Sequence, residues 1–328
     1  MVDISFKGGK IALKGDETIL DALLREGHDI SYSCKAGACQ SCMMRCSSGE
    51  VPAEAQSALK DTLTARGYFL ACKCKPENDI SVESIELSES SEPAEISYKK
   101  IVSDNVVVLR LTPDAKSSLL EAFGGQYVNI TSPENIARSY SIANIPKIDG
   151  CIELHIRKIP DGEFSSWAYD KAEIGDKVSI REPAGECFYF NPDGEEFDIL
   201  LAGTGTGLAP LYAIAKDALL QNHKGKITLL HGALKFENLY FLEKLRQLAK
   251  KNNNFDYIPC VLDGDNIPDY CRVGSFDEIV ESYVINPMNM KYYVCGAPDM
   301  VELLKKKIFL KGASFSDIYS DSFLIRGA

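Results

Sequence analysis

The chain has 328 residues, 45% hydrophobic and 25% charged, a composition typical of a globular protein with two or three domains. Its formal net charge of -11 disfavours nucleic acid as a partner, because phosphate binding needs clustered Lys and Arg. No run of 18 apolar residues predicts a membrane span and no apolar signal core follows Met1, so we expect a cytoplasmic protein whose eleven cysteines stay reduced.

The first block of the chain, up to about residue 87, is predicted to be a small domain of strands and one helix. Short strand-like segments cover 3–7 and 10–13, and a helix is expected to begin near Asp16 or Thr18, with leucines on one face. Alternating residues over 79–87 predict a closing strand.

Four cysteines of this block follow the spacing C-x4-C-x2-C…C, which is the plant-type ligand pattern of a [2Fe-2S] cluster. They are Cys34, Cys39, Cys42 and Cys72. Two irons need four thiolates around them, three of which come from one tight loop. Small residues within 36–41 let backbone N–H groups turn toward the cluster sulfurs. The spacing therefore predicts a [2Fe-2S] site.

Other uses of these cysteines fit the pattern less well. A structural zinc site usually shows two C-x2-C pairs, and only Cys39 and Cys42 form one. A disulfide framework would need an oxidising compartment. Cys74 lies two residues after Cys72 and competes with it as the fourth ligand, although the Leu-x-Cys context favours Cys72. Most of the remaining cysteines are expected to be small buried residues.

An acidic, polar segment with one proline separates this block from a second block rich in short strands. Strands are predicted over 105–111, 126–131, 138–143, 151–158 and 176–182, with Gly and Pro turns between them. Regular short strands indicate a small barrel.

The third block alternates strands with helices, which predicts a doubly wound parallel sheet. Strands are expected over 198–202, 226–231, 255–262 and 291–295, and helices over 208–221 and 238–250. Between the first strand and its helix lies the loop Gly203-Thr204-Gly205-Thr206-Gly207, ahead of Pro210. Such a loop lets backbone N–H groups approach a pyrophosphate at a helix N-terminus, although plain glycine turns are common there.

Several of these motifs resemble the ferredoxin–NADP reductase superfamily. The segment 138–141 resembles its R-x-Y-S flavin motif, 203–210 its nucleotide loop, and 293–296 its late V-C-G segment. The order of blocks is similar to NADH-dependent reductases of multicomponent oxygenases, such as those of benzoate dioxygenase, phenol hydroxylase and methane monooxygenase. It also resembles the reductase that supports C-3 deoxygenation by CDP-6-deoxy-hexulose-3-dehydrase.

The resemblance implies a fold and domain boundaries. It implies a β-grasp [2Fe-2S] ferredoxin domain over 1–88, a linker over 89–96, an antiparallel β-barrel FAD domain over 97–192, and an α/β doubly wound parallel-sheet NAD domain over 193–328.

The resemblance also implies roles for individual residues. Arg138 would meet the flavin pyrophosphate, and Ser141, Cys295 and Asp321 would be the catalytic residues near flavin N5 and the nicotinamide. The other flavin-binding residues would be Tyr140, His155, Ile156, Arg157, Gly162, Phe164, Ser165 and Phe323. The nucleotide would be bound by Gly203, Thr204, Gly205, Gly207, Pro210, Cys295 and Gly296. Five residues follow Phe323, unlike in many relatives.

The implied activity is electron transfer. NADH would reduce FAD by hydride transfer, and single electrons would pass through the [2Fe-2S] cluster to a separate terminal oxygenase or hydroxylase. A deoxysugar dehydrase as acceptor, or a non-catalytic redox carrier or sensor, are the alternatives. Ala233 and Leu234 after the second strand of the sheet favour NADH, while Lys235 leaves NADPH as the alternative nucleotide.

Overall fold

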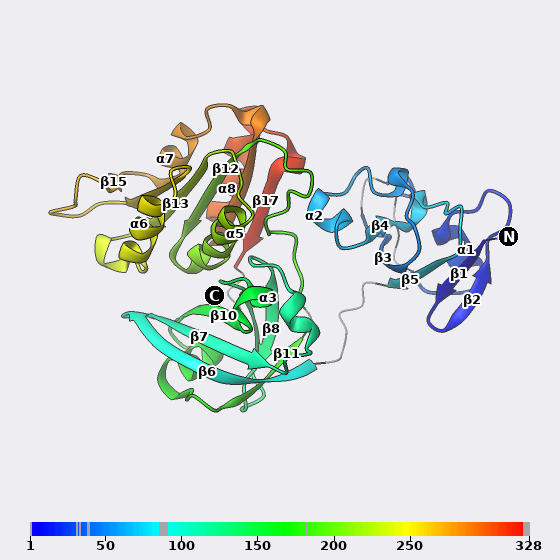
Figure 1. The fold of residues 1–328 in the computed structure, drawn as a ribbon, viewed down its shortest axis with the longest axis horizontal. Coiled ribbons are helices and arrows are strands. Elements are labelled where there is room, and N and C mark those ends of the chain that lie inside the picture. Colours follow the sequence, from blue (N-terminus) through cyan, green and yellow to red (C-terminus); the bar gives the residue numbers. More distant parts are fainter. Residues whose placement is uncertain are drawn as a thin grey trace. The chain divides into compact units, whose positions relative to one another are not determined.

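A computed structural model of the chain describes residues 2–30, 32, 34–37, 40–84, 91–181 and 183–323. The chain divides into two compact units, residues 1–87 and residues 88–328 (Figure 1). Within the described residues, none of the helices combines the length and the apolar character that a membrane crossing requires.

The first unit is a five-stranded mixed sheet packed on one short helix. The strand order is β2-β1-β5-β3-β4, with β1 and β5 parallel and the other neighbours antiparallel. Its elements are β1 (Asp3–Phe6), β2 (Gly9–Ala12), α1 (Ile19–Arg25), β3 (Met43–Ser48), α2 (Asp61–Thr64), β4 (Tyr68–Leu70) and β5 (Ile80–Ser84). The predicted helix start is confirmed at Thr18, whose side chain and that of Asp21 form a capping box.

The second unit begins with a six-stranded antiparallel sheet in the order β10-β7-β6-β11-β8-β9. Its strands are β6 (Ser91–Ser103), β7 (Val106–Pro113), β8 (Tyr127–Thr131), β9 (Ala137–Ser141), β10 (Ile152–Arg157) and β11 (Lys177–Arg181). Two short helices, α3 (Pro146–Asp149) and α4 (Glu163–Ser166), lie in its connections. A bridge between Ile142 and Leu154 joins the two outer strands, so the sheet closes into the predicted barrel.

Part of the segment expected as a linker, 89–96, belongs to a strand, while residues 89 and 90 lie outside the described residues. Strand β6 starts at Ser91 and pairs with β11 from there on. Ala94 and Ile96 are buried in the barrel core, and this burial outweighs the polar, acidic composition around them. The division of residues 88–328 near residue 192 remains a prediction.

The rest of the second unit is a six-stranded parallel sheet in the order β15-β14-β13-β12-β16-β17. Its strands are β12 (Asp198–Thr204), β13 (Ile227–Ala233), β14 (Phe255–Val261), β15 (Arg272–Val273), β16 (Met290–Gly296) and β17 (Ile318–Ser322). The helices are α5 (Leu208–Leu220), α6 (Leu242–Lys251), α7 (Phe276–Ser282) and α8 (Pro298–Leu310). One apolar core contains residues of α5 and α6 and another residues of α7 and α8, which confirms the doubly wound architecture (Figure 1).

Candidate functional site

The cysteine loop of the first unit brings sulfur atoms and backbone N–H groups together. Cys42 and Cys72 are buried, and Cys34 is exposed. The N–H of Ala36 donates to the Cys34 sulfur at 3.3 Å, and the N–H of Gly37 donates to the Cys72 sulfur. Cys39 lies outside the described residues. Among the described residues, which do not include Cys39, no three Asp, Glu, His or Cys side chains are arranged to bind a metal ion.

The two candidates for the fourth ligand have different neighbours. Burial and the neighbouring thiols of Cys42 and Cys34 raise the pKa of Cys72 to about 11. For Cys74, burial and the neighbouring thiol of Cys46 raise the pKa to about 12. Cys72 therefore faces the C-x4-C-x2-C loop, whereas Cys74 is fully buried in the core of this unit.

In the barrel, the R-x-Y-S segment lies beside the turn that opens α4. Arg138, on β9, forms an ion pair of 3.5 Å with Glu163, the first residue of α4. The ring of Tyr140 lies 5.2 Å from that of Phe164, and burial raises the pKa of Tyr140, so its hydroxyl stays protonated. The fold therefore brings together two motifs that are more than 20 residues apart in sequence.

Gly162 caps α4, and the neighbouring side chains are held tightly. The Ser165 hydroxyl donates to the Gly162 carbonyl at 3.2 Å and accepts from the Ile159 N–H at 3.3 Å. Phe164 is buried against Trp167, with ring centroids 5.3 Å apart.

The three predicted catalytic residues converge where the barrel meets the parallel sheet. The Ser141 hydroxyl donates to Oδ2 of Asp321 at 2.6 Å, a contact between residues 180 positions apart. Asp321 lies on β17 directly opposite Cys295 on β16. Burial raises the pKa of Asp321, while the Ser141 hydroxyl opposes that shift by stabilising the carboxylate. Phe323 follows immediately, and its N–H donates to the carbonyl of Gly296 at 2.8 Å.

The glycine loop leads from β12 into α5, as the sequence predicts, and its glycines serve different purposes. A Cβ on Gly207 would lie 2.2 Å from the Cys295 carbonyl oxygen, so only glycine lets the loop pack on β16. Gly205 has φ +54, and the nearest neighbour of a Cβ there would be Nη1 of Arg157 at 3.6 Å. Pro210 is buried in the first turn of α5. The backbone at Gly205 is thus the part of the loop open to a ligand.

A cavity of about 350 Å³ lies beside Gly205 at the carboxyl ends of β12, β13 and β14. Thr204, Ala233, Leu234 and Tyr240 contribute to its wall, and Arg157 reaches it from the barrel. This edge of a parallel sheet is where α/β folds bind nucleotides.

The three consecutive residues expected along the flavin point in different directions. His155 is buried, and its Nδ1 lies 2.9 Å from the Tyr240 hydroxyl. Ile156 is fully buried in the barrel core. Arg157 is exposed and lines the cavity by the glycine loop. Strand alternation explains why Ile156 leaves β10 on the face opposite to that of His155 and Arg157.

Sequence reasoning missed three residues of this region. Cys187 places its sulfur 3.6 Å from that of Cys295, Glu153 is a buried carboxylate, and Tyr240 meets His155. None belongs to a motif. None gave a signal in the sequence, because Glu153 lies in the regularly alternating strand IELHIR, where a polar residue is expected on an exposed face.

Replacing Gly207 with alanine should destabilise the protein by about 1–3 kcal/mol, because the new Cβ cannot fit against the backbone of Cys295. The thermal midpoint should fall, and the affinity for a nucleotide at this sheet edge should weaken as the loop shifts. Gly9→Ala is the control, because its Cβ would meet nothing nearer than the Phe6 carbonyl oxygen at 3.6 Å. A Gly207→Ala variant with an unchanged midpoint and nucleotide affinity would contradict the close packing.

Three families of known domains match consecutive parts of the chain. A 2Fe-2S iron-sulfur cluster binding domain matches residues 5–77, an oxidoreductase FAD-binding domain residues 93–189, and an oxidoreductase NAD-binding domain residues 201–306. The matches follow the order of the three blocks of the sequence.

Several whole proteins are similar to this chain along nearly their full length. The toluate 1,2-dioxygenase electron transfer component of Pseudomonas putida is 30% identical over 94% of this chain and 92% of that protein. The aromatic O-demethylase reductase subunit of an Amycolatopsis species is 31% identical over 98% of both. The CDP-6-deoxy-L-threo-D-glycero-4-hexulose-3-dehydrase reductase of Yersinia pseudotuberculosis is 29% identical over 94% of both.

Among solved structures, the crystal structure of a cytochrome P450 reductase from Amycolatopsis superposes with a TM-score of 0.66. It is 27% identical and covers 98% of this chain and 99% of its own.

Proposed function

The chain belongs to the family of electron-transfer reductases that join a 2Fe-2S ferredoxin domain to FAD- and NAD-binding oxidoreductase domains, and from this premise we propose its task. It takes a hydride from NADH onto FAD and passes single electrons through the [2Fe-2S] cluster to a separate oxygenase or hydroxylase protein. The observation that carries the proposal is the convergence of Ser141, Asp321 and Cys295 between barrel and parallel sheet. The bound cofactors supply the redox chemistry, and the protein supplies position and electrostatics.

The cluster is held by Cys34, Cys39, Cys42 and Cys72 in this proposal. The neighbours of the Cys72 thiol support it, since they are Cys42 and Cys34. Backbone N–H groups of the loop that point at sulfur are donors that tune the potential of a cluster.

The flavin is held by the barrel. Arg138 binds its pyrophosphate together with the α4 turn at Gly162 and Ser165, while Tyr140, Phe164 and Phe323 flank it. The proximity of Arg138 to the first residue of α4 supports this arrangement. Ser141 and Asp321 lie near flavin N5 in this proposal. The hydrogen bond from the Ser141 hydroxyl to the Asp321 carboxylate holds the hydroxyl in place.

The nicotinamide nucleotide binds at the glycine loop, from Gly203 to Gly207, with Cys295 and Gly296 near its reacting end. We assign Arg157 to this nucleotide rather than to the flavin, because its guanidinium lies beside Gly205 and a guanidinium suits pyrophosphate. Among the described residues that line the cavity, Arg157 is the one cation, and Ala233 and Leu234 offer no partner for a 2′-phosphate. We therefore propose NADH as the donor.

Replacing Arg138 with alanine should weaken FAD binding about 10- to 100-fold, because a hydrogen bond to a charged group contributes about 1.5–3 kcal/mol. FAD should be lost during purification while iron and the visible spectrum of the cluster remain. Arg181→Ala, an exposed arginine on β11, serves as the control. If Arg138→Ala keeps FAD with unchanged affinity, Arg138 has no part in the flavin site.

An anaerobic titration with NADH tests the proposed function. The purified protein should take up electrons until flavin and cluster are both reduced, and the reduced cluster should give an EPR signal at low temperature. NADH should give a higher kcat/KM than NADPH with a one-electron acceptor. A protein that binds NADH without any reduction would instead be a carrier or sensor.

Membership of the family does not identify the protein that accepts the electrons, because dioxygenase and dehydrase reductases are similar to this chain to nearly the same degree. Reconstitution with a purified oxygenase, hydroxylase or deoxysugar dehydrase, and measurement of NADH-dependent turnover, decides among these acceptors.

A further inference from the structure

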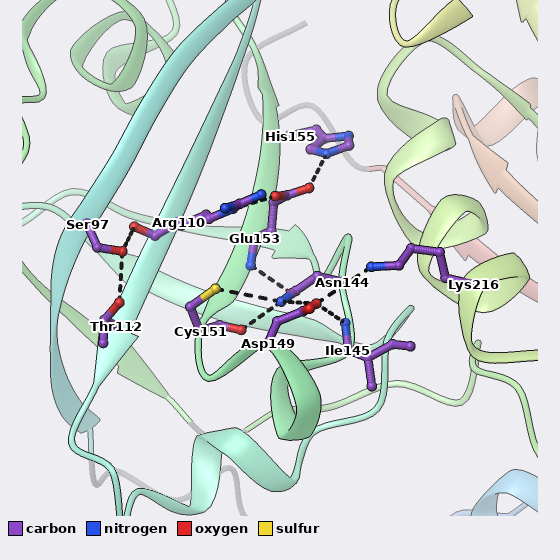
Figure 2. Close-up of polar contacts among 10 residues, drawn as sticks. All are labelled: Ser97, Arg110, Thr112, Asn144, Ile145, Asp149, Cys151, Glu153, His155 and Lys216. Carbon is purple, nitrogen blue, oxygen red and sulfur yellow. Dashed lines mark hydrogen bonds and ion pairs between the residues drawn. The ribbon is translucent and has the colours of Figure 1, made fainter. Parts of the chain in front are cut away.

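A buried network of hydrogen bonds between ionisable side chains lies on β10, the barrel strand next to β7. Glu153 is 4% exposed and His155 is 3% exposed, and both side chains lie on the same face of the strand. Figure 2 shows the Glu153 carboxylate between two partners. Arg110 Nε donates to its Oε2 at 2.8 Å, and His155 Nε2 lies 3.2 Å from its Oε1. A carboxylate this deep in a protein costs free energy unless it is satisfied by such partners.

The donor and acceptor of each hydrogen bond follow from the chemistry of the groups. Burial lowers the pKa of His155, so the imidazole is neutral near neutral pH. Burial alone would raise the pKa of Glu153, but the hydrogen bonds from His155 and Arg110 outweigh it and hold the pKa below its usual value, so the carboxylate is ionised. The carboxylate only accepts, so His155 donates through Nε2 and must accept at Nδ1.

The remaining donor is Tyr240, whose hydroxyl lies 2.9 Å from His155 Nδ1. Burial raises the pKa of Tyr240 well above its usual value, so the hydroxyl keeps its proton and donates. One directed series of hydrogen bonds therefore runs from Tyr240 through His155 to Glu153, whose other oxygen is fixed by Arg110. Inverting one bond would leave a buried donor or acceptor without a partner.

This series connects the two halves of the second unit. Glu153 and His155 belong to the barrel, whereas Tyr240 lies between β13 and α6 of the parallel-sheet half. A second polar link is nearby: Lys216 of α5 lies 3.7 Å from Asp149, at the end of α3 (Figure 2).

Asn144 joins the two links. Its Oδ1 accepts from the Glu153 N–H at 2.8 Å, and its Nδ2 donates to Asp149 at 3.1 Å (Figure 2). The barrel side of both links is thus one hydrogen-bonded framework. Hydrogen bonds are directional, so this framework fixes the orientation of the barrel against the parallel-sheet half, whereas apolar packing alone would let the two surfaces slide.

We propose that Glu153, His155 and Tyr240 are positioning residues, which set the orientation of the nucleotide-binding half against the flavin-binding half. The inference rests on the proposed hydride transfer from NADH to FAD. Domains of one chain move relative to each other unless their interface is large or strongly apolar. Transfer between two bound reactants depends steeply on their distance and alignment, so the hydrogen bonds from Tyr240 and His155 control the rate without touching the reacting atoms.

The test compares Tyr240→Phe with Tyr257→Phe in the full chain loaded with FAD and cluster. Tyr257 makes the matched bond, from a buried hydroxyl to His231 Nδ1 at 3.1 Å, but both partners lie in the same sheet, on β14 and β13. We measure the single-turnover rate constant of flavin reduction at saturating NADH and the NADH dissociation constant. We also follow backbone amide exchange of residues 236–251 without nucleotide.

Tyr240→Phe should lower the rate constant about 2- to 10-fold, the equivalent of one hydrogen bond, with little change in NADH affinity. Amide exchange of residues 236–251 should become faster, because the link to the barrel is lost. Tyr257→Phe should leave the rate constant at that of the unaltered protein. His155→Gln, whose amide can both donate and accept, should keep more of the rate than His155→Leu.

An unchanged rate constant in Tyr240→Phe, an effect on NADH affinity alone, or an equal loss of rate in Tyr257→Phe would overturn the inference. Should Tyr240→Phe fail to retain FAD, the two His155 variants decide: equal rates for Gln and Leu would overturn it. These failures differ from failure of the proposed function, in which NADH does not reduce the flavin of the unaltered protein.

Discussion

Replacing Cys72 with serine should remove the cluster signals and stop electron delivery to any external protein. The Cys72 thiol neighbours Cys42 and Cys34, so we expect it to complete the set of ligands that the C-x4-C-x2-C loop begins. The variant should lose most of its iron, its visible cluster absorption and the EPR signal of the reduced cluster. NADH should still reduce its flavin, because FAD and nucleotide bind in the other unit of the chain.

The matched control is Cys74→Ser, two residues along the chain. Cys74 is fully buried beside Cys46, so its replacement should lower stability while the iron content and EPR signal remain. If Cys74→Ser loses the cluster and Cys72→Ser keeps it, the fourth ligand is Cys74 and the ligand set proposed above is wrong.

Replacing Cys295 with alanine should slow flavin reduction by NADH about 100-fold, with FAD and iron content unchanged. Cys295 lies fully buried near the end of β16, opposite Asp321 and against the glycine loop, which is the place that we propose for the nicotinamide. A displacement of about 1 Å between reacting groups can cost a factor of about 100. Single-turnover flavin reduction measures the effect directly, and NADH affinity should change less than the rate.

Cys187 provides the control for this variant, because its sulfur lies 3.6 Å from that of Cys295 and it is also buried. Cys187→Ala also removes one sulfur atom from this core. It should therefore lower the thermal midpoint by about as much as Cys295→Ala does. Its rate of flavin reduction should stay much closer to that of the unaltered protein. A Cys295→Ala variant that is destabilised but has a normal rate would make Cys295 a core residue only.

The parts of the molecule that sequence predicts best are those encoded by residues close together in the chain. The capping box at Thr18, the C-x4-C-x2-C loop and the glycine loop each lie within a few residues, so spacing alone indicates their structure. The short strands of the barrel and the apolar strands of the parallel sheet are predicted for the same reason, since their patterns are local.

Strand β6 shows where composition misleads. Its first residues are serine, glutamate and proline, which are typical of a linker, yet they pair with β11. Pro93 is tolerated because β7 ends at Pro113, opposite Ala94, so β6 has a strand on one side only at that point. Helix α8 was overlooked although its signals are local: Pro298 at its first position, then Val301, Leu304 and Ile308 on one buried face.

The network around Glu153 lay beyond sequence reasoning because its partners are distant in the chain. His155 and Tyr240 are 85 residues apart, and Ser141 and Asp321 are 180 apart. The resemblance to known reductases suggested the second pair, because both residues belong to family motifs. For the first pair the resemblance includes His155 but gives no role to Tyr240. Arg157 is predicted at the flavin by the same resemblance, and its guanidinium lies beside Gly205 of the glycine loop.

The most direct test of the proposed electron path is anaerobic stopped-flow mixing of the loaded protein with NADH, followed by absorbance and by freeze-quench EPR. We predict that flavin absorbance bleaches first and that the cluster is reduced in a later phase, which disappears in Cys72→Ser while flavin bleaching persists. Reduction of the cluster without prior bleaching of the flavin, or no reduction of either cofactor by NADH, would contradict the proposal.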